Sequence, residues 1–320
     1  MNTEKNKLDV RSVIERFGIV IILLILCIAL SIITPSFLQI KNFMNVLRQV
    51  SITGIIAVGM IFVIATGGID LSVGSITGVV AMVATSLAHP DQFPLIVPIL
   101  VGLLVGVAAG FVNGVIVAYG EVPPFITTLG SMTSLRGAAM IYNNGRPIID
   151  LSEIYTKIGG GMVGSVPVPV IIFLVIIALG TIILHYTRFG RHVFAVGGNE
   201  LAAKVSGINV KRVKLSVFMI TGFVSAVTGI VVSSRVMSGS PIAGEGYEMD
   251  AITACVIGGA SLSGGEGGVV STIIGALIVG VVSNGLDLMH VKSYWQSVVK
   301  GIIVVAAVLI DIQTKKNRKS

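Results

Sequence analysis

Long runs of apolar residues, separated by short polar stretches, follow one another along almost the whole chain. A helix needs about 20 predominantly apolar residues to cross the ~30 Å hydrocarbon layer of a bilayer. The eighth run is short and contains Gly258 and Gly259, so it predicts a partial or re-entrant segment that neighbouring helices bury. In all, the runs predict about ten transmembrane helices, over residues 17–34, 50–66, 72–88, 95–118, 125–142, 168–186, 214–236, 250–263, 269–287 and 296–311.

Composition excludes a soluble globular domain. Of the 320 residues, 54% are hydrophobic and only 12% are charged, and the mean hydropathy is +0.97. A soluble domain carries about twice this charged fraction. So few polar residues cannot cover the surface of a folded chain of this size, so lipid must be the solvent for most of it. The predicted fold class is an all-α polytopic membrane protein.

The distribution of basic residues orients the predicted helices. The chain has a net charge of +7, and 14 of its 22 Lys and Arg residues lie at the two ends or between residues 188 and 214. Ten spans place these three groups on one side, which the positive-inside rule makes cytoplasmic. We therefore expect a cytoplasmic N-terminal segment (1–16), a transmembrane domain (17–311) with a cytoplasmic loop (187–213), and a basic cytoplasmic tail (312–320). No aromatic residues alternate with the basic ones, which argues against a nucleic-acid partner.

Two pairs of segments suggest an internal repeat. Residues 67–74 (GGIDLSVG) are similar to residues 258–265 (GGASLSGG), and residues 110–114 (GFVNG) are similar to residues 280–285 (GVVSNG). Two halves of five spans each would have opposite orientations, because five is odd, and inverted repeats are a recurring design of transporters. The alternative is that glycine-rich membrane helices resemble one another by chance.

No catalytic motif is present in the sequence. It contains no G-x-x-x-x-G-K-[ST] phosphate loop, no H-E-x-x-H and no G-x-S-x-G, and its four histidines are scattered near the ends of predicted spans. We therefore expect no enzymatic activity on this chain and no cofactor bound to it.

The loop between the sixth and seventh spans carries the clearest local signal. Asn199 is placed to cap a short helix over residues 200–205, and Gly207 is placed to end it. Ala202 and Ala203 give this helix small residues at adjacent positions. Such a helix could enter a cleft of another protein, or the loop could be an ordinary solvated connector.

Four segments in order carry a resemblance to a known family. They are the loop around residues 187–210, GGIDLSVGS at 67–75, GFVNG at 110–114 and AGEGYEMDAI at 243–252. Together they resemble the permease subunit of bacterial ABC monosaccharide importers, and the likeness extends over about residues 36–311. The ribose-type permeases are the most similar subgroup, although galactose, xylose or another furanose remains open as the sugar.

The resemblance implies an assembly in the bacterial cytoplasmic (inner) membrane. A second permease copy, in a homodimer or a paired permease, would pair with this chain within the lipid. Two cytoplasmic subunits would bind ATP and Mg, and a periplasmic or lipid-anchored protein would deliver the sugar. It also implies a coupling segment seated on the ATPase, formed by Gly198, Asn199, Glu200, Ala202, Ala203, Ser206, Gly207 and Ile208.

Polar residues within the apolar runs are candidates for the translocation path. Asp70 could contact the cargo, or it could cap the helix that follows it. Asn113 and Asn284 could bind sugar hydroxyls, or they could tie pairs of helices together. Arg136 needs a carboxylate, a carbonyl or water as its partner, and the sequence does not identify which. The predicted path residues are Asp70, Ser72, Asn113, Ser263 and Asn284.

Three further polar residues lie in a predicted outer loop. Tyr247, Glu248 and Asp250 could meet the sugar-binding protein or act as a gate.

A secondary transporter coupled to protons or sodium would also have ten spans and inverted repeats. Such transporters need ionisable residues deep in the membrane, and Asp70 and Arg136 are few for that purpose. An enzyme acting on lipids would need paired carboxylates or histidine clusters, which the sequence lacks.

Overall fold

The computed structural model describes residues 10–319, with side chains described for residues 18–306, 308 and 309. Residues 1–9 of the predicted N-terminal segment and Ser320 of the predicted tail lie outside this range. Two short strands pair as an antiparallel hairpin, β1 (Met162–Val163) with β2 (Val166–Pro167). The α-helices are α1 (Val10–Ile33), α2 (Ile40–Ala65), α3 (Val73–Ser86), α4 (Ile96–Ala118), α5 (Pro124–Tyr142), α6 (Glu153–Gly160), α7 (Val168–Thr181), α8 (Arg188–Gly198), α9 (Glu200–Val205), α10 (Val210–Arg235), α11 (Tyr247–Ile257), α12 (Val269–Leu288) and α13 (Ser293–Lys319).

Each predicted span corresponds to one helix, and most bounds agree within a few residues. The sixth span is α7 continued by a π-helical turn, η2 (Ile182–Tyr186). The largest difference is at α2, which begins at Ile40 and not at residue 50, after a 3₁₀ turn η1 (Pro35–Leu38). The first ten residues of α2 are rich in polar side chains, several of which line a cavity, so an apolar-run criterion misses them.

The described residues contain five helices that are long and apolar enough to cross a membrane: α2, α4, α7 with η2, α10 and α12. The helices at the third and eighth predicted spans, α3 and α11, are shorter. At 1.5 Å per residue, the 14 residues of α3 and the 11 residues of α11 span about 21 and about 16 Å. The short eighth segment is therefore confirmed, and α11 is too short to cross the hydrocarbon layer alone.

Helix α2 lies at the centre of the bundle. From Val50 to Ala65 every residue of α2 is buried, because α7, α10, α11 and α12 surround it. By contrast, α4 exposes large apolar side chains such as Leu100 and Leu104 on its outer face. A helix that is apolar all round is typical of a central position, whereas an apolar outward face is suited to lipid.

Close backbone packing joins α4 to α10. A Cβ atom on Gly110 would lie 3.1 Å from the Cα of Gly222, and one on Gly106 would lie 2.6 Å from the carbonyl oxygen of Gly222. Small residues let membrane helices approach in this way, where apolar packing alone gives no preference between neighbours.

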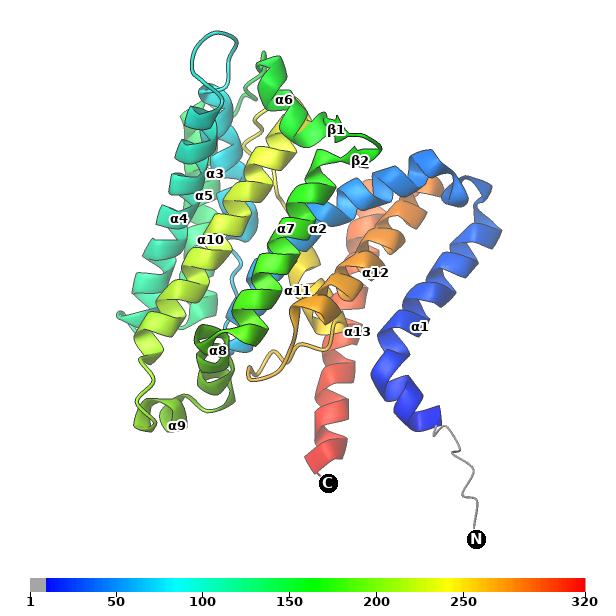
Figure 1. Cartoon of the computed structure of the whole chain (residues 1–320), viewed down its shortest axis with the longest axis vertical. Helices are drawn as coiled ribbons and strands as arrows, with labels where there is room; N and C mark the ends of the chain where they lie inside the picture. The colour runs from blue at the N-terminus through cyan, green and yellow to red at the C-terminus, as the bar shows by residue number, and fades with distance from the viewer. Residues whose placement is uncertain (1–9, 320) are drawn as a thin grey trace.

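A short amphipathic helix, α6, covers one end of the bundle beside the β1–β2 hairpin (Figure 1). The hydroxyl of Tyr155 lies 2.7 Å from Ser233 Oγ, and Ser234 Oγ donates to the carbonyl oxygen of Tyr155 at 2.6 Å. Burial raises the pKa of Tyr155 to about 12. Its hydroxyl therefore stays protonated and can donate to Ser233, whose own proton goes to the carbonyl of Gly229.

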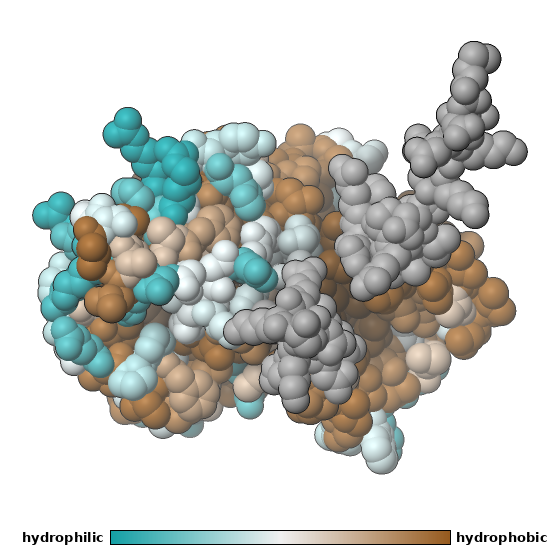
Figure 2. Space-filling model, turned by 90° about the horizontal axis from the view of Figure 1, so that it is seen from below, coloured by the Kyte–Doolittle hydropathy of each residue, from teal (hydrophilic) through white to brown (hydrophobic). Residues whose placement is uncertain are grey.

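Helices α8 and α9, the start of α1 and the end of α13 lie at the same end of the molecule, opposite α6 (Figure 1). We call the end with α8 and α9 the coupling end, and the opposite end, with α6, the outer end. Seen from the coupling end, hydrophilic side chains gather over one part of the face and apolar side chains cover the flanks (Figure 2).

Of the two pairs of similar segments, only one has its members at equivalent positions in the fold. Residues 110–114 lie in α4 and residues 280–285 lie in α12, each in the second helix of a short–long pair. Residues 67–74 precede and enter the short helix α3, whereas residues 258–265 follow the short helix α11. The glycine-rich segments are therefore not in equivalent positions, and only the second pair fits a repeat.

Candidate functional site

The short helix predicted in the loop after the sixth span is confirmed as α9. The side chain of Asn199 accepts a hydrogen bond from the backbone N–H of Ala202 at 2.9 Å, which caps the helix as expected. Gly207 has a φ of +84°, a left-handed conformation that suits glycine and ends the helix. Both residues that mark the ends of this element can therefore be recognised from the local sequence.

Two large apolar side chains are exposed on α9, beside its charged residues Glu200 and Lys204. Leu201 and Val205 lie one helical turn apart and are 73% and 83% exposed. Ala203 is buried and packs α9 against the body of the protein, so the predicted face of small residues is not presented whole. Leu201 and Val205 are not among the predicted coupling residues, although their i, i+4 spacing beside the cap was a visible signal.

Polar contacts hold α9 in place. The carboxylate of Glu200 lies 2.7 Å from the ammonium of Lys214 on α10. The side chain of Asn209 caps α10 by accepting from the N–H of Arg212 at 3.0 Å. Helix α9 is therefore fixed at its start to α10, with only three residues between Ser206 and the start of that helix.

A cluster of glycines joins α8 to two membrane segments. A Cβ atom on Gly197 would overlap the carbonyl oxygen of Ala65, at the end of α2, and would lie 2.6 Å from the nitrogen of Gly265. The N–H of Gly265 donates to that same carbonyl at 3.0 Å. A Cβ atom on Gly264 would lie 2.8 Å from the nitrogen of Gly67. We call Ala65, Gly67, Gly197, Gly264 and Gly265 the glycine junction.

Three predicted path residues form one buried cluster near the coupling end. Asp70 Oδ1 accepts hydrogen bonds from the N–H and the hydroxyl of Ser72 at 2.9 and 2.6 Å, and the amide of Asn113 donates to the Ser72 hydroxyl at 2.9 Å. All three residues are buried. The contacts connect the entry of α3 to α4, which fits the capping and helix-tying interpretations of these residues.

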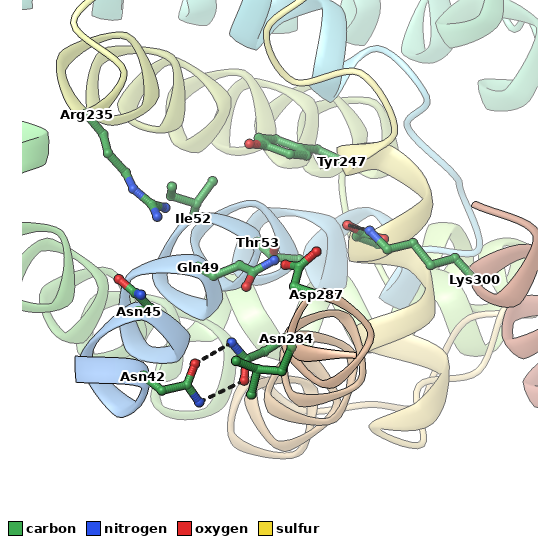
Figure 3. Close-up of a pocket in the computed structure, with 12 residues that line it drawn as sticks. Asn42, Asn45, Gln49, Ile52, Thr53, Arg235, Tyr247, Asn284, Asp287 and Lys300 are labelled. Atoms are coloured by element: carbon green, nitrogen blue, oxygen red, sulfur yellow. Dashed lines mark hydrogen bonds and ion pairs between the residues drawn. The ribbon is translucent and has the colours of Figure 1, made fainter. Parts of the chain in front are cut away.

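A polar cavity of about 490 Å³ lies at the outer end, where α2 begins (Figure 3). We call it the outer cavity. Five helices contribute to its wall: α2, α10, α11, α12 and α13. It is lined by Asn42, Asn45, Gln49, Ile52, Thr53, Arg235, Tyr247, Asp250, Asn284, Asp287, Leu288 and Lys300.

Charges in the outer cavity are balanced. Lys300 and Asp250 form an ion pair at 2.9 Å, and Asp287 accepts from the side chain of Gln296 at 2.8 Å. With Arg235, the lining holds two cationic and two anionic side chains. Its formal charge is therefore zero.

Two asparagines tie α2 to α12 at the cavity wall. Asn42 and Asn284 exchange hydrogen bonds in both directions, at 3.0 and 2.9 Å, and both are buried (Figure 3). A reciprocal amide pair satisfies one donor and one acceptor on each side chain. Asn284 thus fits both interpretations made from the sequence, because the residue that ties two helices also lines a cavity.

With this geometry in place, comparison with known proteins identifies the family. A family model described as "Branched-chain amino acid transport system / permease component" matches residues 42–308. The match covers most of the chain. The chain belongs to this permease family.

Curated relatives agree with this assignment. The permease is 45% identical over 313 residues to the ribose import permease protein RbsC of Bacillus subtilis, with 97% of each chain covered. It is 43% identical over 302 residues to the probable ABC transporter permease protein YphD of Escherichia coli, with 93% of this chain and 90% of the relative covered.

A xylose transport system permease protein, XylH of Haemophilus influenzae, is 36% identical over 342 residues, with 88% of this chain and 91% of the relative covered. No solved structure shows a significant match. The resemblance found from the sequence motifs is confirmed, and the chain is a multi-pass permease of the bacterial cytoplasmic membrane.

The five predicted path residues do not line one space in the permease. Asp70, Ser72 and Asn113 lie together near the coupling end, whereas Asn284 lies in the wall of the outer cavity. Ser263 is in the loop of the glycine junction, where its N–H donates to Ser261 Oγ at 3.2 Å. The fold therefore places these five predicted residues in three different regions.

The predicted outer-face residues also differ from a docking surface. Asp250 is buried in its ion pair with Lys300, and Tyr247 lines the outer cavity. Glu248 accepts from the N–H of Gly246 at 3.2 Å. In this structure Asp250 is therefore not available to a docking protein.

The partner of Arg136, which the sequence did not identify, is a loop. Its guanidinium donates to the carbonyl oxygens of Pro241 and Ala243 at 2.6 and 3.0 Å. Carbonyl groups thus satisfy a charge that would be costly in the membrane, and the loop before α11 is held against α5.

Proposed function

We propose that this permease is the membrane subunit of an ATP-driven importer that carries a monosaccharide, with ribose as the favoured sugar. One observation supports the proposal most: α9, a helix with two exposed apolar side chains, is connected through α8 and the glycine junction to the ends of membrane segments in a chain without a nucleotide-binding motif. The names of the relatives, which describe ribose and xylose permeases, favour a sugar as cargo.

The proposed topology has ten helices that enter or cross the membrane: α1, α2, α3, α4, α5, α7, α10, α11, α12 and α13. The coupling end is cytoplasmic, because three groups of basic residues belong to the chain ends and to the α8–α10 region. A cytoplasmic segment (1–16) and a basic tail (312–320) would flank the transmembrane domain (17–311).

Two inverted halves are part of the same proposal. The series α2, α3, α4 has 26, 14 and 23 residues, and the series α10, α11, α12 has 26, 11 and 20 residues. The long–short–long order and the matching asparagines of α4 and α12 support the repeat. Inverted halves place a transport path at their interface.

The proposed partners follow from the two ends of the molecule. A cytoplasmic subunit that binds ATP and Mg would seat on α9, through Leu201 and Val205 beside the predicted coupling residues. A second copy of the permease would complete the membrane part. A sugar-binding protein would dock at the outer end, where α6 and the hairpin lie.

The proposed mechanism begins with movement of α9. When ATP binding closes the partner subunits, α9 and α8 would move together, since Asn199 joins them directly. The glycine junction would pass this movement to the end of α2 and to the loop that leads into α12. Because backbones touch there without intervening side chains, little of the displacement would be absorbed by rotamer changes.

Reconstituted vesicles test the proposal. Permease and ATP-binding subunit would be placed in vesicles with ATP inside, no ion gradient, and labelled D-ribose with its binding protein outside. Uptake that requires ATP supports the proposal. Uptake that occurs only with a proton or sodium gradient would support the rival secondary transporter.

A further inference from the structure

The outer cavity has an unusually polar wall for the interior of a membrane protein. Ten of its twelve lining residues are polar or charged, and only Ile52 and Leu288 are aliphatic. Its volume of about 490 Å³ is within the range of small-molecule sites, about 300–1,000 Å³. Residues 40–49 of α2 supply much of this wall, and they have no role in the coupling described above.

Several of these polar groups are free to bind a ligand. Among the described residues, none forms a hydrogen bond with the side-chain amides of Asn45 and Gln49 or with the hydroxyl of Tyr247. Figure 3 shows Asn45 and Gln49 on α2, with Arg235 and Tyr247 across the space from them. Amides and hydroxyls both donate and accept, so they match the hydroxyl groups of a carbohydrate.

The charge balance indicates which ligands the cavity does not favour. Lys300 is paired with Asp250, and the four charged side chains sum to zero, so neither an anion nor a cation gains from the cavity as a whole. With only two aliphatic residues, the wall offers no apolar pocket for the side chain of a branched-chain amino acid.

We infer that the outer cavity receives an uncharged, polyhydroxylated ligand of about pentose size from the outer side, with Asn45, Gln49 and Tyr247 as its hydroxyl-binding groups. This inference rests on the proposed function and adds to it the place where the sugar first meets the permease. The amide pair of Asn42 and Asn284 would form a fixed part of the wall, because its hydrogen bonds are already satisfied.

Uptake of labelled D-ribose by the complete reconstituted transporter tests the inference. Gln49→Leu and Asn45→Leu should each lower the uptake rate about tenfold, which is the effect of one lost hydrogen bond to a ligand. Gln92→Leu is the matched control, because Gln92 is exposed in the loop between α3 and α4 and lies outside the cavity. Wild-type uptake in both cavity variants would overturn the inference.

Sugar uptake by the wild-type assembly distinguishes a failure of the proposed function from a failure of the cavity assignment. If the wild-type assembly takes up no sugar with ATP, the proposed function fails. If it takes up D-ribose and the cavity variants do so equally well, only the cavity assignment fails.

Labelling gives a second test that does not depend on transport. Asn45→Cys places a thiol on an exposed position of the cavity wall, and a membrane-impermeant maleimide added outside should react with it. The native Cys255 is buried and gives little background, and the unsubstituted protein measures the contribution of Cys27. Excess D-ribose should slow labelling at least threefold, whereas L-leucine should not. No protection by D-ribose, or equal protection by L-leucine, would overturn the inference.

Discussion

The glycine junction and the outer cavity lie at opposite ends of α2 and differ in what fills the space between helices. At the junction, an added Cβ atom would overlap the carbonyl oxygen of Ala65 if placed on Gly197 and would lie 2.8 Å from the nitrogen of Gly67 if placed on Gly264. At the cavity, long polar side chains leave about 490 Å³ unfilled. Backbone atoms fill the space at one end of the central helix, and polar side chains surround a cavity at the other.

Helix α2 connects the glycine junction to the outer cavity. Helix α2 is buried from Val50 to Ala65, so its inner part is held on all sides. The α2 residues that line the cavity, from Asn42 to Thr53, lie toward the start of the helix. A displacement at Ala65 would therefore reach the cavity as movement of the whole helix, because a packed interior transmits strain.

A methyl group at the glycine junction should have the largest effect on transport. Gly197→Ala would force α8 away from the end of α2, since the new Cβ would overlap the carbonyl oxygen of Ala65. We expect ATP-dependent uptake to be abolished while the protein still inserts in the membrane. Gly137→Ala, on α5, is the matched control, because no atom lies within 4 Å of its added Cβ. Equal uptake by the two variants would contradict a role for the junction.

Two substitutions next to α9 should also abolish uptake. Glu200→Lys replaces the ion pair with Lys214 by two like charges, and Gly207→Pro demands a negative φ where the chain has +84°. Membrane insertion and the sugar affinity of the external binding protein should remain unchanged, which immunoblotting and sugar titration would check. Normal uptake in both variants would refute the proposed role of this helix.

A charge on the exposed face of α9 should have a smaller effect. Burying a leucine or valine side chain contributes about 1.5–3 kcal/mol, so Leu201→Asp or Val205→Asp should weaken association with the ATP-binding subunit about 10- to 100-fold. Ile154→Asp, on an exposed residue of α6 at the outer end, should leave it unchanged. Binding measured with purified components would distinguish these cases, and an equal loss in all three variants would indicate general destabilisation.

The smallest effect is expected where the amide pair meets the cavity. Asn42→Leu leaves the amide of Asn284 without its partner, which should cost about 1–3 kcal/mol of stability. The double variant Asn42→Leu with Asn284→Leu should recover part of this loss, because neither side chain is then an unpaired polar group. Thermal unfolding in detergent would measure both. A double variant as unstable as the sum of the single variants would show that the pair does not couple.

The sequence predicted best those features that depend on neighbouring residues. Helix α9 has its predicted bounds because Asn199 and Gly207 are local signals. The apolar runs located the membrane helices because hydrophobicity needs only a contiguous segment. The start of α2 was missed, since Asn45 and Gln49 are polar and interrupt the apolar run, and both line the outer cavity.

Features that require distant segments could not be predicted in this way. The outer cavity draws its wall from five helices, and Asn42 is 242 residues away from its partner Asn284. The glycine junction joins three separated segments, and no pattern around Gly197 distinguishes it from Gly198, although of the two only Gly197 lacks room for a Cβ atom. Asp250 was expected to lie on the outer face. Its burial could not be predicted, because the ion pair with Lys300 depends on the packing of α13.

Crosslinking from α9 tests most directly the claim that energy enters this permease through its coupling end. A photo-reactive residue at position 201 would be introduced into the purified permease, which would then be mixed with its ATP-binding subunit and irradiated. We predict a crosslink to that subunit from position 201 and none from the same residue placed at position 154. Absence of any association with an ATP-binding subunit, or sugar transport by the permease alone, would contradict the account.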